Sequence, residues 1–188
     1  MLSTFLRLLR SNMSKRIYKS DLSTKGIEKL IDDLINYKKE ILQRKIDLFA
    51  KTLAEDGVDI AQVNVARLDA IFTGELIASI HKKYGYSKSG TAVYFVVADS
   101  YHAAFVEFGT GQVGKDNSYP YPLPEGVKWE YNSGEKIIPI GPGQYGWFYP
   151  GDDGRWYFTQ GMPSRPFMYE TLLELMKTVE KAAKEVFE

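Results

Sequence analysis

The sequence predicts an α+β fold, in which a long N-terminal helix and a C-terminal helix pack on a small antiparallel β-sheet with an aromatic β-hairpin insert. Three patterns support this prediction. Apolar residues recur every three or four positions over 22–56 and again over 164–186, as on one face of a helix. Two β-prone runs within 77–99 flank a Ser-Lys-Ser-Gly turn. The insert, 111–162, is rich in Gly, Pro and aromatic residues.

Length and composition limit the domain count and the classes of partner. The 188 residues suit a single domain, which we place at 21–188, and 44% of them are hydrophobic, enough for a core. The 24 basic and 24 acidic residues balance, so no global charge directs the chain to nucleic acid or to a membrane. There is no cysteine, which excludes disulfides and thiolate chemistry. No apolar run approaches the roughly 20 residues of a membrane span.

Residues 1–20 form a basic N-terminal arm, with no acid before Asp21. Its short apolar start is interrupted by Arg7 and lacks a cleavage site, which excludes a signal peptide. A solvated basic tail is one interpretation. A start codon at Met13 is another, because Arg10-Ser11 can be encoded as a ribosome-binding sequence just upstream. An arm that contacts a partner or DNA is the least favoured.

The helix predicted over 22–56 can be capped by Ser23 or Thr24 and ended by Gly57. A helix of about 30 residues is long for a compact domain of this size, so we expect part of its apolar stripe to pack on a neighbouring subunit. Residues 58–67 are β-branched and follow a glycine, which favours a strand, with a helix as the alternative.

The clearest hairpin pairs Ile77–Tyr86 with Thr91–Asp99, and Gly90 supplies the special backbone angles of its turn. The run 92–98 is apolar on both faces, which predicts a central strand covered on both sides by helices or by another subunit. Tyr101–Phe108 reads as a short helix with a cap at Asp99 or Ser100 and an end at Gly109 and Gly111. The C-terminal helix is expected to be capped by Ser164.

The insert 111–162 holds all three tryptophans, and we expect two small hairpins, near 127–140 and 145–159, with turns at 132–134 and 152–154. Three roles for its rings stay open: a core for the insert itself, a protein interface, or stacking on sugar rings. The candidate interface residues are Trp129, Trp147, Tyr149 and Trp156.

The motifs that could carry chemistry are weak, so we expect no enzyme, no cofactor and no metal site. Gly109–Lys115 fits the phosphate-loop pattern, but Asp116 stands where that loop needs Ser or Thr, and an acid would repel phosphates. His102 lies five residues from Glu107, a spacing at which helical side chains do not face each other. His81 has no partner group in a recognisable pattern, and the turn at 152–153 offers only two carboxylates.

Two short motifs, Glu107-Phe-Gly-Thr110 and Pro163-Ser-Arg-Pro-Phe167, are predicted to form a clasp between the sheet region and the C-terminal helix. Gly109 should adopt a backbone conformation that is costly for other residues, and Thr110 should hydrogen-bond nearby backbone. Arg165 is expected close to a carboxylate, with Glu107 as the first candidate.

These two motifs, preceded by Thr73-Gly-Glu-Leu-Ile-Ala-Ser-Ile80, resemble in order the head–tail joining proteins of tailed bacteriophages, also described as tail-completion or neck proteins or minor tail components. The resemblance spans about residues 73 to 175, and the insert is longer than the family leads us to expect. The signature positions are Glu107, Phe108, Gly109, Thr110, Gly111, Arg165, Pro166 and Phe167.

The resemblance implies a virion structural protein, assembled in the host cytoplasm as an oligomeric ring at the head–tail junction. It implies contacts with connector or neck proteins and with tail-tube or tail-terminator proteins, passage of double-stranded DNA through the lumen, no membrane and no catalytic residue. The alternative function is a carbohydrate-binding module that uses the Trp- and Tyr-rich hairpins.

Overall fold

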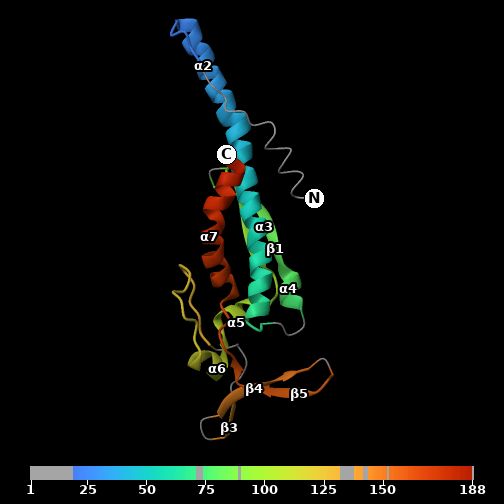
Figure 1. The fold of residues 1–188 in the computed structure, drawn as a ribbon. Coiled ribbons are helices and arrows are strands. Elements are labelled where there is room, and N and C mark those ends of the chain that lie inside the picture. The colour runs from blue at the N-terminus through green and yellow to red at the C-terminus, as the bar shows by residue number, and fades with distance from the viewer. Residues whose placement is uncertain are drawn as a thin grey trace. The chain divides into compact units, whose positions relative to one another are not determined.

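The computed structural model describes residues 19–70, 74–88, 90–131, 138–141, 144–151 and 153–187 (Figure 1). The basic arm predicted over 1–20 lies almost entirely outside these residues. The chain divides into two compact units, Met1–Asp47 and Leu48–Glu188. The predicted α+β class is confirmed, with a long N-terminal helix, two small antiparallel sheets and a C-terminal helix.

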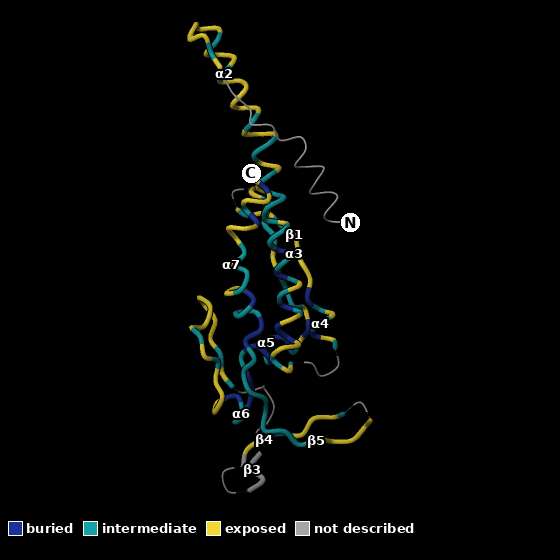
Figure 2. Tube along the Cα trace, viewed as in Figure 1, coloured by how far each residue is buried: buried dark blue, intermediate teal, exposed yellow. Residues whose placement is uncertain are grey.

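The first unit contains α2 (Thr24–Asn36), the π-helix η1 (Tyr37–Leu42) and the beginning of α3 (Gln43–Arg67). Ser23 caps α2 as predicted, because its hydroxyl accepts a hydrogen bond from the Gly26 amide at 3.0 Å. Neither α2 nor η1 buries a residue, and Figure 2 shows α2 without dark blue. Four of its large apolar side chains are exposed: Ile27, Ile31, Leu34 and Ile35.

The helix does not end at Gly57, and the strand predicted over 58–67 is wrong, since α3 continues to Arg67. Ala61 and Val65, four residues apart, are both fully buried and continue the apolar face of a helix. Gly57 has a packing role instead. A Cβ at this position would lie 2.8 Å from Val96 Cγ2, so the glycine lets α3 approach strand β2 (Ala92–Ala98) closely.

The core of the second unit lies where five elements meet. These are α3, α4 (Glu75–Ser79), β1 (Ile80–Tyr86), α5 (Ala103–Phe108) and α7 (Phe167–Phe187). Phe167, which is only 1% exposed, begins α7 at the centre of the core. Strand β2 contributes partly buried side chains. The buried apolar residues of this cluster are Ala61, Val65, Leu76, Ile80, Ala103, Val106 and Phe167.

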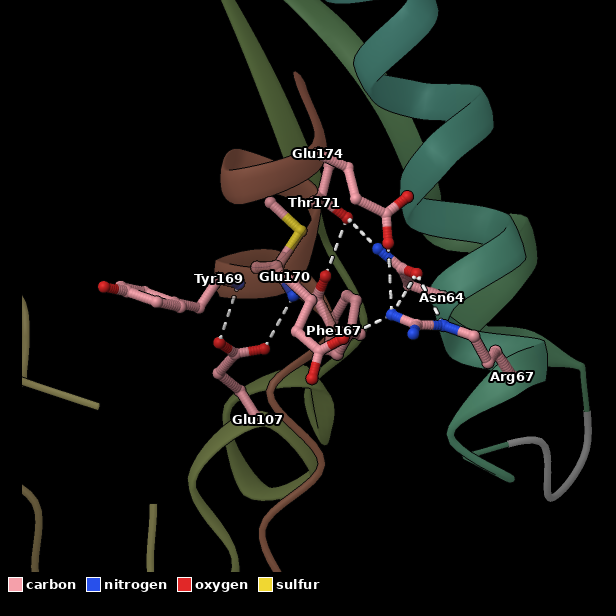
Figure 3. Close-up of polar contacts among 9 residues, drawn as sticks. Asn64, Arg67, Glu107, Phe167, Tyr169, Glu170, Thr171 and Glu174 are labelled. Atoms are coloured by element: carbon pink, nitrogen blue, oxygen red, sulfur yellow. Dashed lines mark hydrogen bonds and ion pairs between the residues drawn. The ribbon is translucent and has the colours of Figure 1, made fainter. Parts of the chain in front are cut away.

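A buried polar contact joins α3 to α7 (Figure 3). The Asn64 side chain is fully buried and donates a hydrogen bond to Thr171 Oγ1 at 3.1 Å. Its oxygen accepts from the Arg67 guanidinium at 2.8 Å, and Arg67 also pairs with Glu170 and, at 3.2 Å, with Glu174. The nitrogen and the oxygen of the buried Asn64 amide therefore each have a hydrogen-bond partner.

Strands β1 and β2 form the predicted hairpin, with antiparallel pairing from Ile80↔Ala98 to Tyr86↔Ala92 and Gly90 at a φ of 78° in its turn. The prediction that 92–98 is a central strand is wrong for the described chain, where β2 pairs only with β1. Coverage of both faces is also incomplete, since Phe95 is 51% exposed. The run that reads as a central strand is thus an edge strand.

The insert begins with α6 (Gly111–Asp116), so Gly111 starts a helix and does not end one. Its sheet has the order β3 (Ile138–Gly141), β4 (Gln144–Pro150), β5 (Trp156–Thr159). The β4–β5 pair confirms the hairpin predicted near 145–159. The hairpin predicted over 127–140 is wrong: 127–131 are not a strand, and β3 pairs with β4. The predicted turn at 132–134 lies outside the described residues.

The helices of the described chain include none that combines the length and the apolarity of a membrane span.

Candidate functional site

The predicted clasp is present as a joint between two segments far apart in sequence, 106–111 and 161–168. Strand β6 (Gly161–Met162) makes antiparallel bridges to Thr110 and Gly111. The Arg165 amide donates to the Val106 carbonyl at 2.8 Å, and the Ser164 hydroxyl donates to the Glu107 carbonyl at 2.7 Å. Backbone and side-chain hydrogen bonds therefore fasten the end of the insert to α5.

Two glycines allow the two segments of the clasp to approach. Gly109 has a φ of 82°, as predicted, and a Cβ there would lie 2.8 Å from the Ser164 backbone nitrogen. At Gly161, with a φ of 97°, a Cβ would lie 1.9 Å from the Thr110 carbonyl oxygen. Thr110 also accepts a hydrogen bond from the Met162 amide at 3.3 Å, which confirms its predicted contact with backbone.

The side chain of Glu107, a residue of α5, lies at the N-terminal end of α7 (Figure 3). Its buried carboxylate accepts hydrogen bonds from the Met168 amide at 2.8 Å and the Tyr169 amide at 3.1 Å, and Tyr119 donates at 3.4 Å. These amides belong to the first turn, which has no intrahelical acceptor. Glu107 therefore caps α7 from another element and places a negative charge at the positive end of the helix dipole.

The environment of Glu107 perturbs two titratable groups. Burial raises the pKa of the Glu107 carboxyl, and the hydrogen bonds from Met168, Tyr169 and Tyr119 only partly oppose this. Burial, together with the nearby Glu107 carboxylate, raises the pKa of the Tyr119 hydroxyl far above its ordinary value. Tyr119 therefore stays protonated and acts as a donor.

Arg165 does not pair with Glu107, which corrects the prediction. Its Nε donates to the Leu68 carbonyl at 3.0 Å, so the side chain ties the clasp to the chain that follows α3. Glu107 has its oxygens occupied by backbone amides and has no need of a cationic partner. Of the other signature positions, Pro166 is buried, Phe167 is in the core, and Phe108 packs against Tyr119 and Trp129.

The four candidate interface residues divide into two groups. Trp129 lies in the clasp: its ring centroid is 5.0 Å from that of Phe108, and its Nε1 donates to the Gly109 carbonyl at 3.0 Å. Trp147 is partly buried beside Gly111. Tyr149 and Trp156 lie on the β4–β5 hairpin and are exposed. The structure thus brings Trp129 and the signature residues together and leaves Tyr149 and Trp156 outside.

The β4–β5 hairpin carries aromatic rings on both faces. In its register Tyr149 is opposite Tyr157, and Phe148 is opposite Phe158 on the other face. These rings pack in pairs, with centroids 5.9 Å and 5.3 Å apart. The exposed fractions remain between 39% and 67% for five of the aromatic residues: Tyr145, Phe148, Tyr149, Trp156 and Tyr157.

A pocket of about 310 Å³ adjoins this hairpin. Its lining includes Gly111 and Gly146, together with three rings and two polar side chains. These are the rings of Tyr131, Tyr145 and Trp147 and the side chains of Gln112 and Lys115. The two histidines lie elsewhere, with His81 3.5 Å from Asp99 and His102 hydrogen-bonded to Ser100. Within the described residues, no three metal-binding side chains gather.

Comparison of the chain with protein-family models, with curated proteins and with solved structures gave no match.

Proposed function

We propose that the protein is a self-assembling structural subunit, which forms a ring at the head–tail junction of a tailed bacteriophage and lets the DNA pass through. The observation that carries this proposal is the β4–β5 hairpin. Both of its faces present aromatic rings to solvent, and aromatic residues are the side chains most enriched at the centres of protein interfaces. Such a hairpin is best explained by a neighbour that covers it.

A second exposed apolar surface supports self-assembly. The amphipathic helix α2 leaves Ile27, Ile31 and Leu34 uncovered on one side. Exposed apolar residues are ordinary when scattered, but a continuous stripe on a helix indicates an interaction site. The chain therefore offers two apolar surfaces to neighbours, one on α2 and one on the β4–β5 hairpin.

The arrangement of the three ordered motifs supports the particular class of subunit. Leu76 and Ile80 of the first motif contact the same core as Phe167 of the third, and Glu107 of the second caps α7. The motifs that carry the resemblance to head–tail joining proteins thus form one folding unit. This is the behaviour expected of signature residues that preserve a scaffold while the surfaces adapt to partners.

Three experiments test the proposed function. Native mass spectrometry at high protein concentration should show ring-sized oligomers, and mass spectrometry of purified particles should find the chain at low copy number. Deletion of the gene should leave filled heads and finished tails that fail to join. A protein that stays monomeric and is absent from particles would contradict the proposal.

The pocket beside Trp147 supports the carbohydrate-binding alternative. Three rings with a lysine and a glutamine match the mixture of stacking and hydrogen bonding by which proteins bind sugars. In a glycan-binding assay, the Trp147→Ala variant should then lose binding that the wild type shows. The Trp156→Ala variant is a matched control, because Trp156 does not line the pocket.

A further inference from the structure

The two strands of the first sheet have opposite edge chemistry. β1 carries Lys82 and Lys83, the kind of charged side chains that protect an exposed edge from pairing with another chain. β2 has no charged residue and no proline, and its pairing with β1 shows no bulge. Its sequence is that of a strand with a neighbour on each side, while the described chain gives it one.

The free edge of β2 has backbone groups ready for pairing. The Asp99 amide donates to Ser79 and the Ser87 amide to Thr91, so the odd-numbered residues of β2 direct their amides and carbonyls toward β1. Val96 and Ala98 therefore direct theirs to the opposite edge. No backbone hydrogen bond within the described parts of the chain uses those groups.

A groove of about 480 Å³ runs along this edge, between β2, α5 and the start of α7. Its walls are mainly apolar, and an aromatic side chain entering it would contact strand residues on one side and helix residues on the other. The residues that form these walls include Val96, Ala98, Ala104, Phe108, Met168 and Leu172.

Strand β5 has the complementary features. Trp156–Thr159 contains no charge, and β5 pairs only with β4 in the described chain. Because the Gly151 amide donates to the Arg155 carbonyl at 2.7 Å, Trp156 and Phe158 direct their backbone groups away from β4. Trp156 is the most exposed of the aromatic residues described on the hairpin, at 67%. A free strand edge and an uncovered indole thus occur together.

We propose that β5 of one copy adds antiparallel to the free edge of β2 in a second copy, and that Trp156 enters the groove between β2 and α7. Pairing Trp156 with Ala98 and Phe158 with Val96 joins the outward backbone groups of both strands. These pairs share a face of the sheet, and Val96 and Ala98 pack toward the core on that face. The two rings therefore point into the groove.

Charge selects the antiparallel orientation. In the proposed register Arg155 lies opposite Asp99, and the side chains of both residues are largely exposed in the single copy. A parallel addition that keeps Trp156 opposite Ala98 would instead place Arg155 opposite Val97, which carries no charge. Opposite charges across a strand pair stabilise it, and like charges destabilise it.

This contact deepens the proposed function, on which it rests, by naming the surfaces through which copies assemble. Each copy has one β2 edge and one β5 edge, so the contact is head-to-tail. Head-to-tail contacts close into a ring when the rotation between copies allows it. The chain would then assemble through a continuous antiparallel sheet, in which β1 and β2 of one copy continue into β5 and β4 of the next.

Engineered cysteines test the register, because the natural chain contains none. Val97 and Tyr157 would form a non-hydrogen-bonded pair with Cα atoms about 4.5 Å apart, a separation that accepts a disulfide. A mixture of the Val97→Cys and Tyr157→Cys variants should give oxidised dimers with one chain of each. The double variant should give longer ladders or closed rings on non-reducing gels.

The matched control mixes Tyr157→Cys with Val93→Cys. Val93 lies on the same face of β2, four residues or about 13 Å away, and should not cross-link. In the chain without engineered cysteines, Trp156→Ala should weaken self-association at least about tenfold. Asp99→Arg and Arg155→Asp should each weaken it, and the combination of both should restore it.

The outcomes separate this contact from the proposed function. Oligomers that form without the Val97–Tyr157 cross-link, or a cross-link at Val93, would overturn the strand contact and leave the ring proposal standing. A specific cross-link in a protein that is absent from particles would support the contact and contradict the function. A cross-link in particles from Val97 to a different protein would overturn a second copy as the occupant.

Discussion

Trp129 and Trp156 come from the same aromatic insert but have different surroundings. Trp129 packs in the clasp, where its ring touches Phe108 and its nitrogen donates to the Gly109 carbonyl. Trp156 lies on the β4–β5 hairpin with two thirds of its surface exposed. The clasp is a region where hydrogen bonds and packing are satisfied internally. In the hairpin, the aromatic rings are exposed and one edge of β5 has no strand paired to it in the described chain.

The comparison teaches that the signature motifs and the proposed interaction surface are separate. Glu107, Gly109 and Arg165 fasten the insert to the scaffold through backbone contacts. The hairpin that the clasp holds carries the exposed rings. The motifs therefore hold the scaffold together, while the exposed rings that we propose as an interface lie outside the motifs.

The largest contrast is expected between two glycines of similar φ. Gly109→Ala should lower the free energy of unfolding by about 3 kcal/mol, because the new Cβ adds a clash with the Ser164 backbone to the strain of a left-handed φ. Gly154→Ala, in the hairpin turn, should cost only about 1 kcal/mol, since nothing lies within 4 Å of its Cβ. Chemical denaturation measures both, and equal costs would mean that the clasp is not tightly packed.

The tryptophans themselves should separate stability from assembly. Trp129→Ala removes packing against Phe108 and leaves the Gly109 carbonyl without its donor, at a cost of about 2–3 kcal/mol of folding stability. Trp156→Ala should change folding stability by less than about 0.5 kcal/mol. Thermal melts of dilute protein report this difference. A large loss of stability in Trp156→Ala would show that the ring belongs to the insert's own core.

The smallest effect concerns pH, and its sign differs between the two regions. The pKa of Glu107 is raised, so its contribution to stability is present below the ordinary glutamate pKa and is lost as pH rises through the raised value. The pKa of Asp153, in the hairpin turn, is lowered by hydrogen bonds from Tyr157 and the Arg155 amide, so its contribution is lost as pH falls. The melting temperature of wild type minus that of Glu107→Gln should decline as pH rises. A difference that increases with pH would contradict this sign.

Much of the scaffold could be predicted from local patterns. The β1–β2 hairpin and the β4–β5 hairpin followed from turn residues between β-prone runs, and the conformation of Gly109 followed from its place after a short helix. The prediction at Gly57 was wrong because the glycine serves a tertiary contact. It makes room for Val96 and does not end a helix. Local sequence gives no sign of that contact.

The hydrogen-bond partners of Glu107 also could not be predicted from the sequence around it. The amides it accepts from lie 61 and 62 residues away, and their need for an acceptor arises only when α7 begins at Phe167. We expected Arg165 to pair with Glu107. The backbone amides at the N-terminal end of α7 take the place of that cation. The central strand predicted over 92–98 was wrong for the described chain, where β2 has one neighbour. In our proposal, another copy supplies the second neighbour.

The buried amide of Asn64 has a consequence for how the chain folds. Helix α7 is synthesised about 100 residues after α3, and its apolar face could dock on α3 one turn too early or too late, a slip of about 5.4 Å. Either slip would carry Thr171 away from Asn64 and leave a polar group unpaired in the core, which costs about 1–3 kcal/mol. One hydrogen bond between helices therefore acts as a proofreading contact, since it penalises misdocked chains that apolar packing alone would tolerate.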